Sequence, residues 1–185
     1  MSTLEVKELS HPAGQVIKIA SGKTLDLNSQ GTLVLPTIPH AKMPSGSVLQ
    51  VINATHTSEV SNSTNTFQNT GLTATITPSS TTSKILVMVN QNGIFKSSSS
   101  ANNALGLKLL RGSTDISVIA SNTGYTATAI QNYDATISTS YLDSPSTTSA
   151  TTYKTQFRSA NNTSVVAVQR GSTNASTITL MEIQG

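Results

Sequence analysis

The chain has 185 residues, which is enough for one sizeable hydrophobic core and a small appendage. Charged residues make up only 10% of it and the formal net charge is +3, with basic residues scattered singly, so we expect no nucleic-acid partner. The absence of cysteine excludes a disulfide framework and a thiolate metal site.

The chain is rich in serine and threonine, a composition that also occurs in disordered proteins. Its apolar residues nevertheless fall in short alternating bursts along the whole length, without a sustained helical period, and this pattern favours a folded all-β chain. Residues 1–8 contain no apolar stretch of signal-peptide length, and no run approaches the ~20 apolar residues of a membrane helix. We therefore expect no membrane insertion, and release by host lysis if the protein acts outside a cell.

The N-terminal segment has its own regularity. Apolar pairs recur every eight residues with glycine in the turns between them, namely Ile17/Ile19, Leu25/Leu27 and Leu33/Leu35. Strands this short cannot bury a face alone, so the pattern favours a shaft of stacked or intertwined strands over an ordinary meander of three strands. Prolines at 36, 39 and 44 then indicate a stiff linker over residues 36–46. We predict a β arm or shaft with its linker at 1–45 and a head domain at 46–185.

The sequence of the head domain predicts a series of short strands with hydroxyl-rich loops between them. The expected strands are 48–52, 72–77, 85–89, 105–110, 116–120, 135–141, 152–158, 165–170 and 177–183. This rhythm predicts an antiparallel jelly-roll sandwich. Residues 85–89 are apolar on both faces, so we expect the opposite sheet to cover one face and another subunit to cover the other. The last strand would anchor the C-terminus if it lies centrally in a sheet.

One block of sequence occurs twice. Residues 100–103 (SANN) and 111–114 (RGST) are repeated at 159–162 and 170–173, an offset of 59 residues at both ends. A polar loop, an alternating strand and a glycine turn are the parts of a β-hairpin, so the block predicts two related hairpins.

Three tyrosines are the best candidates for surface contacts. Tyr125, Tyr133 and Tyr141 recur every eight residues, and aromatic rings are a common platform for sugars and receptors. The alternative is that these rings close the ends of the barrel or stand beside cross-strand neighbours.

Catalytic patterns are lacking, since the chain has neither a nucleophile elbow nor a phosphate-binding loop. Asp115, Asp134 and Asp143 could pair for glycoside hydrolysis, but capping of turns is the simpler role for each. The histidines, His11, His40 and His56, could bind a metal only where symmetry-related copies meet on an axis. We expect a non-enzymatic protein without cofactor or metal, and retain a glycan-cleaving depolymerase as an alternative.

Several segments resemble virion proteins of tailed phages, above all tail-fibre-like proteins of marine cyanophages. The likeness lies in residues 19–27, 70–78, 83–89, 107–114 and 176–183. More distantly, residues 67–183 resemble the strand rhythm of the complement globular-head and tumour-necrosis-factor jelly rolls, which are trimers.

The resemblance implies a homotrimeric appendage in the virion. Residues 1–45 would attach it to other tail or capsid proteins, and the head would contact a host-surface glycan or protein. A capsid decoration or head-fibre protein anchored through its N-terminal segment is the alternative, and no site residue is implied in either case.

Overall fold

The computed structural model describes residues 38–97, 103–128, 133–161 and 164–185. The chain divides into two units, Met1–Thr37 and Ile38–Gly185, so all of the described residues belong to the second unit. The predicted shaft pairs and His11 therefore lie outside the described residues.

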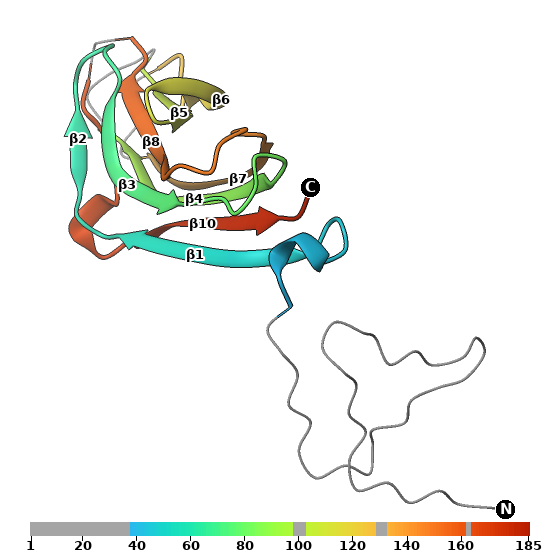
Figure 1. Cartoon of the computed structure of the whole chain (residues 1–185). Coiled ribbons are helices and arrows are strands. Elements are labelled where there is room, and N and C mark those ends of the chain that lie inside the picture. The colour runs from blue at the N-terminus through green and yellow to red at the C-terminus, as the bar shows by residue number, and fades with distance from the viewer. Residues whose placement is uncertain (1–37, 98–102, 129–132, 162–163) are drawn as a thin grey trace, which may run out of the picture. The chain divides into compact units, whose positions relative to one another are not determined.

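The described residues form ten strands and two short 3-10 helices, η1 (His40–Lys42) and η2 (Arg170–Ser172) (Figure 1). The strands are β1 (Val48–His56), β2 (Val60–Asn62), β3 (Gln68–Ile76), β4 (Lys84–Lys96), β5 (Leu105–Arg111), β6 (Thr114–Thr123), β7 (Tyr133–Asp143), β8 (Thr151–Ser159), β9 (Val166–Val168) and β10 (Ser176–Ile183).

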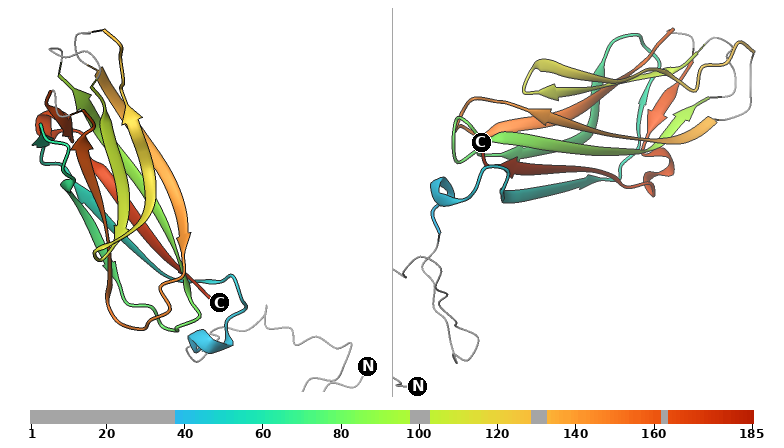
Figure 2. Two further views of the ribbon diagram at one scale, coloured as in Figure 1. Left: turned by 90° about the horizontal axis from the view of Figure 1, so that it is seen from above. Right: turned by 90° about the vertical axis from the view of Figure 1, so that its right-hand side faces the viewer.

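These strands build two antiparallel sheets that pack as a sandwich (Figure 2). One sheet has the order β1-β10-β4-β9-β2, with β7 on the other edge of β4, and the second sheet has the order β3-β8-β5-β6. The chain passes repeatedly from one sheet to the other, and β1-β10-β4-β7 facing β3-β8-β5-β6 is the strand arrangement of a jelly roll. The predicted all-β antiparallel jelly-roll sandwich is confirmed.

The core lies between the sheets because alternate residues of the strands point inward, and most of the large side chains among them are apolar. In β4, Ile85, Val87 and Val89 are fully or almost fully buried, and they pack with Leu72 and Ile76 of β3. Full burial of one such side chain contributes about 1.5–3 kcal/mol. A second cluster around Leu107 and Phe157 fills the other end of the sandwich.

Each strand expected from the sequence is present, and the differences are in length. The strand expected at 85–89 extends to Lys96, and β2, with three residues, was not foreseen because so short a segment has no readable alternation. The last strand, β10, lies between β1 and β4, so the predicted anchoring of the C-terminus is confirmed.

The prediction of two related hairpins is half wrong. The first block forms the β5–β6 hairpin, which turns at Gly112 with φ of +58°. The second block gives the three-residue strand β9 and then η2, with left-handed backbone at Gln169 and Gly171. The amide of Gln169 donates to the Asn92 carbonyl at 3.0 Å, so contact with β4 replaces the second hairpin.

Candidate functional site

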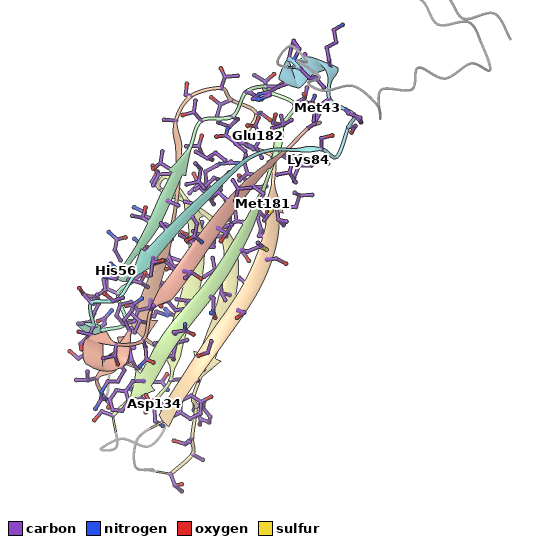
Figure 3. The ribbon with its side chains drawn as sticks, turned by 90° about the horizontal axis from the view of Figure 1, so that it is seen from below. Met43, His56, Lys84, Asp134, Met181 and Glu182 are labelled. Atoms are coloured by element: carbon purple, nitrogen blue, oxygen red, sulfur yellow. The ribbon has the colours of Figure 1, made fainter. Side chains whose placement is uncertain are left out.

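An apolar row crosses the outer face of the six-stranded sheet. The strand registers align Val51 of β1, Met181 of β10, Leu86 of β4 and Leu142 of β7 side by side. We call these four residues the apolar row. Val51 is 53% exposed and Leu142 is 52% exposed. We call the side of β1, β10, β4 and β7 that is turned away from the core the outer face, and Figure 3 shows it toward the viewer, with Met181 labelled.

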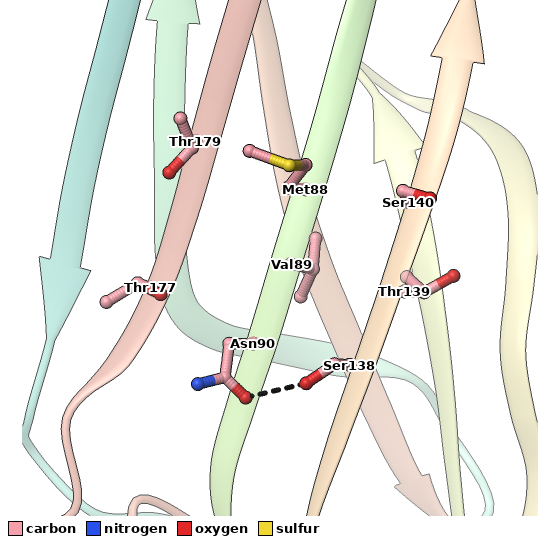
Figure 4. A pocket seen from close by; sticks show the side chains of 8 residues that line it. All are labelled: Met88, Val89, Asn90, Ser138, Thr139, Ser140, Thr177 and Thr179. Carbon is pink, nitrogen blue, oxygen red and sulfur yellow. Dashed lines mark hydrogen bonds between the residues drawn. The ribbon is translucent and has the colours of Figure 1, made fainter.

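The neighbouring positions of the outer face carry hydroxyl and amide groups. Ser138 donates to Asn90 Oδ1 at 2.9 Å, and Asn53 donates to Thr179 Oγ1 at 2.8 Å. A shallow pocket of about 560 Å³ opens here across β10, β4 and β7 (Figure 4). On the outer face it is lined by Met88, Asn90, Ser138, Ser140, Thr177 and Thr179.

Charged residues lie at the ends of this face and not within it. Lys84 lies at one end and Asp134 at the other, and both are exposed (Figure 3). The outward positions of the four strands between these two residues carry no charge. Depletion of charge together with grouped apolar side chains is the composition of a protein interface core.

The opposite sheet presents a different surface. Lys108 forms an ion pair with Asp115 at 2.8 Å, and its ammonium group lies 4.3 Å from the centre of the Phe67 ring. The guanidinium group of Arg158 lies 4.9 Å from the centre of the same ring. Val118 of β6 is 67% exposed. One sheet therefore has a charged exterior and the other has an uncharged, partly apolar exterior.

The three candidate tyrosines do not form one platform. Tyr125 follows β6 and is 52% exposed, whereas Tyr141 packs against the first core cluster. The Tyr133 ring covers Gly124, where an added Cβ would come within 2.8 Å of it. Tyr133 and Tyr141 are eight residues apart on β7, a separation of about 26 Å. Their role as surface contacts stays a prediction.

The three aspartates occupy different environments. Asp143 is buried and accepts hydrogen bonds from Arg111 at 2.8 Å and from the Tyr153 hydroxyl at 2.6 Å. Burial and the nearby carboxylate raise the pKa of Tyr153, so this hydroxyl stays a donor. Asp115 pairs with Lys108, and Asp134 is exposed at the far end of β7 from Asp143.

The histidines within the described residues are also separated. His40 is exposed in η1, and the His56 ring covers Gly71, where an added Cβ would lie 2.2 Å from Nε2. No group of three or more histidine or acidic side chains able to hold a metal occurs in the described part of the chain.

Sequence reasoning missed two buried ionisable groups. Lys96 is 1% exposed and donates to the Asn103 carbonyl at 3.3 Å and to Thr126 Oγ1, and burial lowers its pKa.

Glu182 is fully buried and accepts hydrogen bonds of 2.6 Å from both the amide and the hydroxyl of Ser79. Burial opposes ionisation of Glu182, but the hydrogen bonds from Ser79 and Gln50 outweigh this effect and lower its pKa.

The sequence signal for the burial of Lys96 was Gly93. This glycine marks a bulge in β4, and the bulge changes which side chains of the strand point inward.

Comparison with known protein families gave no match, and neither did comparison with curated proteins. Among solved structures, the chain is similar to VP2 of infectious bursal disease virus in a subviral particle, with a TM-score of 0.47 and 16% identity over 83% of this chain. It is also similar to a chain of the T13 particle of the same virus, with a TM-score of 0.42 and 15% identity over 83% of this chain. The overlaps cover 37% and 40% of those viral chains, so this chain spans less than half of either.

The described residues contain no helix that is long and apolar enough to cross a bilayer.

Proposed function

We propose that this protein is a non-enzymatic structural component of a phage virion, a homotrimeric tail-fibre-like appendage that adheres to the host surface. The observation that carries the proposal is the outer face, a broad uncharged sheet surface with an apolar row suited to packing against other protein. The jelly-roll fold and the resemblance of the sequence to virion proteins of tailed phages support it.

In this proposal the chain has two parts with separate tasks. Residues 1–45 attach the appendage to other virion proteins, and the head at 46–185 projects from the particle. Three weak head contacts on one stem gain avidity because binding of the first raises the effective concentration of the others. Tyr125 is the most exposed of the candidate contact tyrosines.

The second candidate is a capsid decoration or head-fibre protein. It uses the same jelly roll and the same outer face, but residues 1–45 would bind the shell and the head would need no receptor.

The test is to locate the protein on intact particles. An epitope tag at the N-terminus and an antibody against the head are imaged on particles by electron microscopy. We expect the tag at the tail and the head antibody farther out, in groups of three. Signal on the shell would favour the decoration protein, and absence of the protein from washed particles would refute both.

Host adhesion is tested with the purified full chain. We expect it to bind host cells or isolated host envelope and to compete with particles for attachment. A Tyr125→Ser variant should bind more weakly if this ring contacts the receptor. A chain that is in the particle but does not bind the envelope would favour the decoration protein.

A further inference from the structure

We infer that the apolar row and the hydroxyl and amide groups beside it form the surface on which a second copy of this chain packs. The inference rests on the proposed function in requiring an oligomer, and it adds which face of the head makes the contact. The occupant is another copy of the head, seated on the outer face of β1, β10, β4 and β7.

The size of the face fits such a contact. Four strands spaced about 4.8 Å apart and eight residues long give a surface of about 19 by 26 Å, or roughly 500 Å² in projection. The accessible area of a corrugated sheet exceeds its projection, so the face approaches the ~800 Å² that each partner buries in a standard interface. Its central strands, β10 and β4, are fixed on both sides by neighbouring strands, which makes the face rigid before binding.

The position of the apolar side chains argues against a surface that stays in water. Leu86 and Met88 alternate with the buried residues Ile85, Val87 and Val89, so β4 is apolar on both sides along this stretch. Half-exposed strands ordinarily carry polar residues on the solvent side. Met181 and Leu142 extend the apolar surface across both neighbouring strands, and this continuity distinguishes a patch from single exposed residues.

The chemistry of the face favours a second copy over a charged partner. A highly charged protein seated here would lose the hydration of its charges and gain no counter-charge between Lys84 and Asp134. An identical face contributes apolar side chains and hydroxyls, and each hydroxyl can both donate and accept a hydrogen bond. Within a homotrimer the heads run parallel, so the uncharged stretch between Lys84 and Asp134 is the part of each face that neighbouring copies would share.

The first test compares three single substitutions in the full chain. Val51→Glu and Leu142→Glu place a carboxylate in the apolar row, and Val118→Glu makes the same change at an exposed apolar position of the opposite sheet. Mass is measured by multi-angle light scattering across a range of protein concentrations. We expect wild type and Val118→Glu to be equally oligomeric, and the other two to associate at least about tenfold more weakly.

A second measurement does not depend on how well a glutamate is tolerated. Because the chain contains no cysteine, Val51→Cys, Leu142→Cys and Val118→Cys each introduce a single thiol. We expect alkylation at 51 and 142 to slow at least about tenfold between dilute and concentrated protein, and alkylation at 118 to stay unchanged.

The outcomes separate this inference from the proposed function. A wild-type oligomer whose positions 51 and 142 react as fast as 118 overturns the assignment of the face and leaves the appendage proposal intact. Wild-type protein that is monomeric at about 100 μM overturns the inference and the proposed homotrimer together. Presence of the protein in virions is measured separately and decides the virion role alone.

Discussion

At the scale of single residues, Lys96 is a buried cation. Its hydrogen bonds are to a backbone carbonyl and a threonine hydroxyl, so no carboxylate among the described residues balances its charge by an ion pair. Burial lowers its pKa below the ordinary 10.5. Below 10.5 and above the folded-state pKa, the unfolded chain therefore binds more protons at this site, and the free energy of unfolding rises with pH.

This arrangement gives the first prediction. Replacing Lys96 with methionine keeps the length of the side chain and removes the titrating group. We expect Lys96→Met to match or exceed the stability of wild type at pH 7, and to lose the rise in stability that Lys96 causes as pH approaches 10.5. Urea unfolding between pH 7 and pH 10 measures both effects. Lys42→Met, at an exposed position, should keep the wild-type slope.

Glu182 gives a pH dependence of the same sign, but in the acid range. Its pKa is lowered below 4.5, so the stability it contributes is present above 4.5 and is lost as pH falls through the folded-state pKa. In Glu182→Gln, the amide NH₂ would face either the donors of Ser79 or the side-chain amide of Gln50, and we expect a loss of about 1–3 kcal/mol at neutral pH. The variant should also lose less stability than wild type on acidification. An Asp134→Asn control with the same acid response as Glu182→Gln would contradict this assignment, because Asp134 is exposed.

At the scale of elements, the sequence was most informative for strands with one side in the core and the other side toward solvent. β8 and β10 alternate between buried and half-buried residues along their whole length, and the period of two was readable in both. The sequence could not show which strands pair or where β4 bulges, because both depend on contacts between distant segments. The repeated block illustrates this: identical RGST letters form a hairpin turn after β5 and a 3-10 turn after β9.

The same limit applied to the candidate site. Leu86 and Met88 were identifiable as the second apolar side of β4, since that inference needs only local alternation. Val51, Met181 and Leu142 could not be grouped with them without knowing the strand order and the register. The eight-residue spacing of the tyrosines was a real regularity, but in an extended strand that spacing separates side chains instead of clustering them.

Alanine substitutions at two glycines test whether the bulge in β4 is in close contact with η2. Gly93 and Gly112 both have φ of +58°, so alanine pays the same backbone strain at each. An added Cβ at Gly93 would lie 2.4 Å from the Arg170 amide nitrogen, whereas nothing lies within 4 Å at Gly112. We expect Gly112→Ala to lose about 1 kcal/mol and Gly93→Ala at least about 2 kcal/mol more, measured by thermal or urea unfolding. Equal losses would show that β4 and η2 are not in close contact.

At the scale of the whole molecule, stability should depend on protein concentration. A head that packs on a second copy is stabilised by mass action, because the partner binds the folded chain and not the unfolded one. The Tm of wild type should therefore rise by several degrees between about 1 and 100 μM, and the Tm of Leu142→Glu should stay nearly constant. Val118→Glu, with the same added charge on the opposite sheet, should follow wild type. A concentration-independent Tm for wild type would mean that the sandwich is stable with its outer face in water, and the apolar row would then need another explanation.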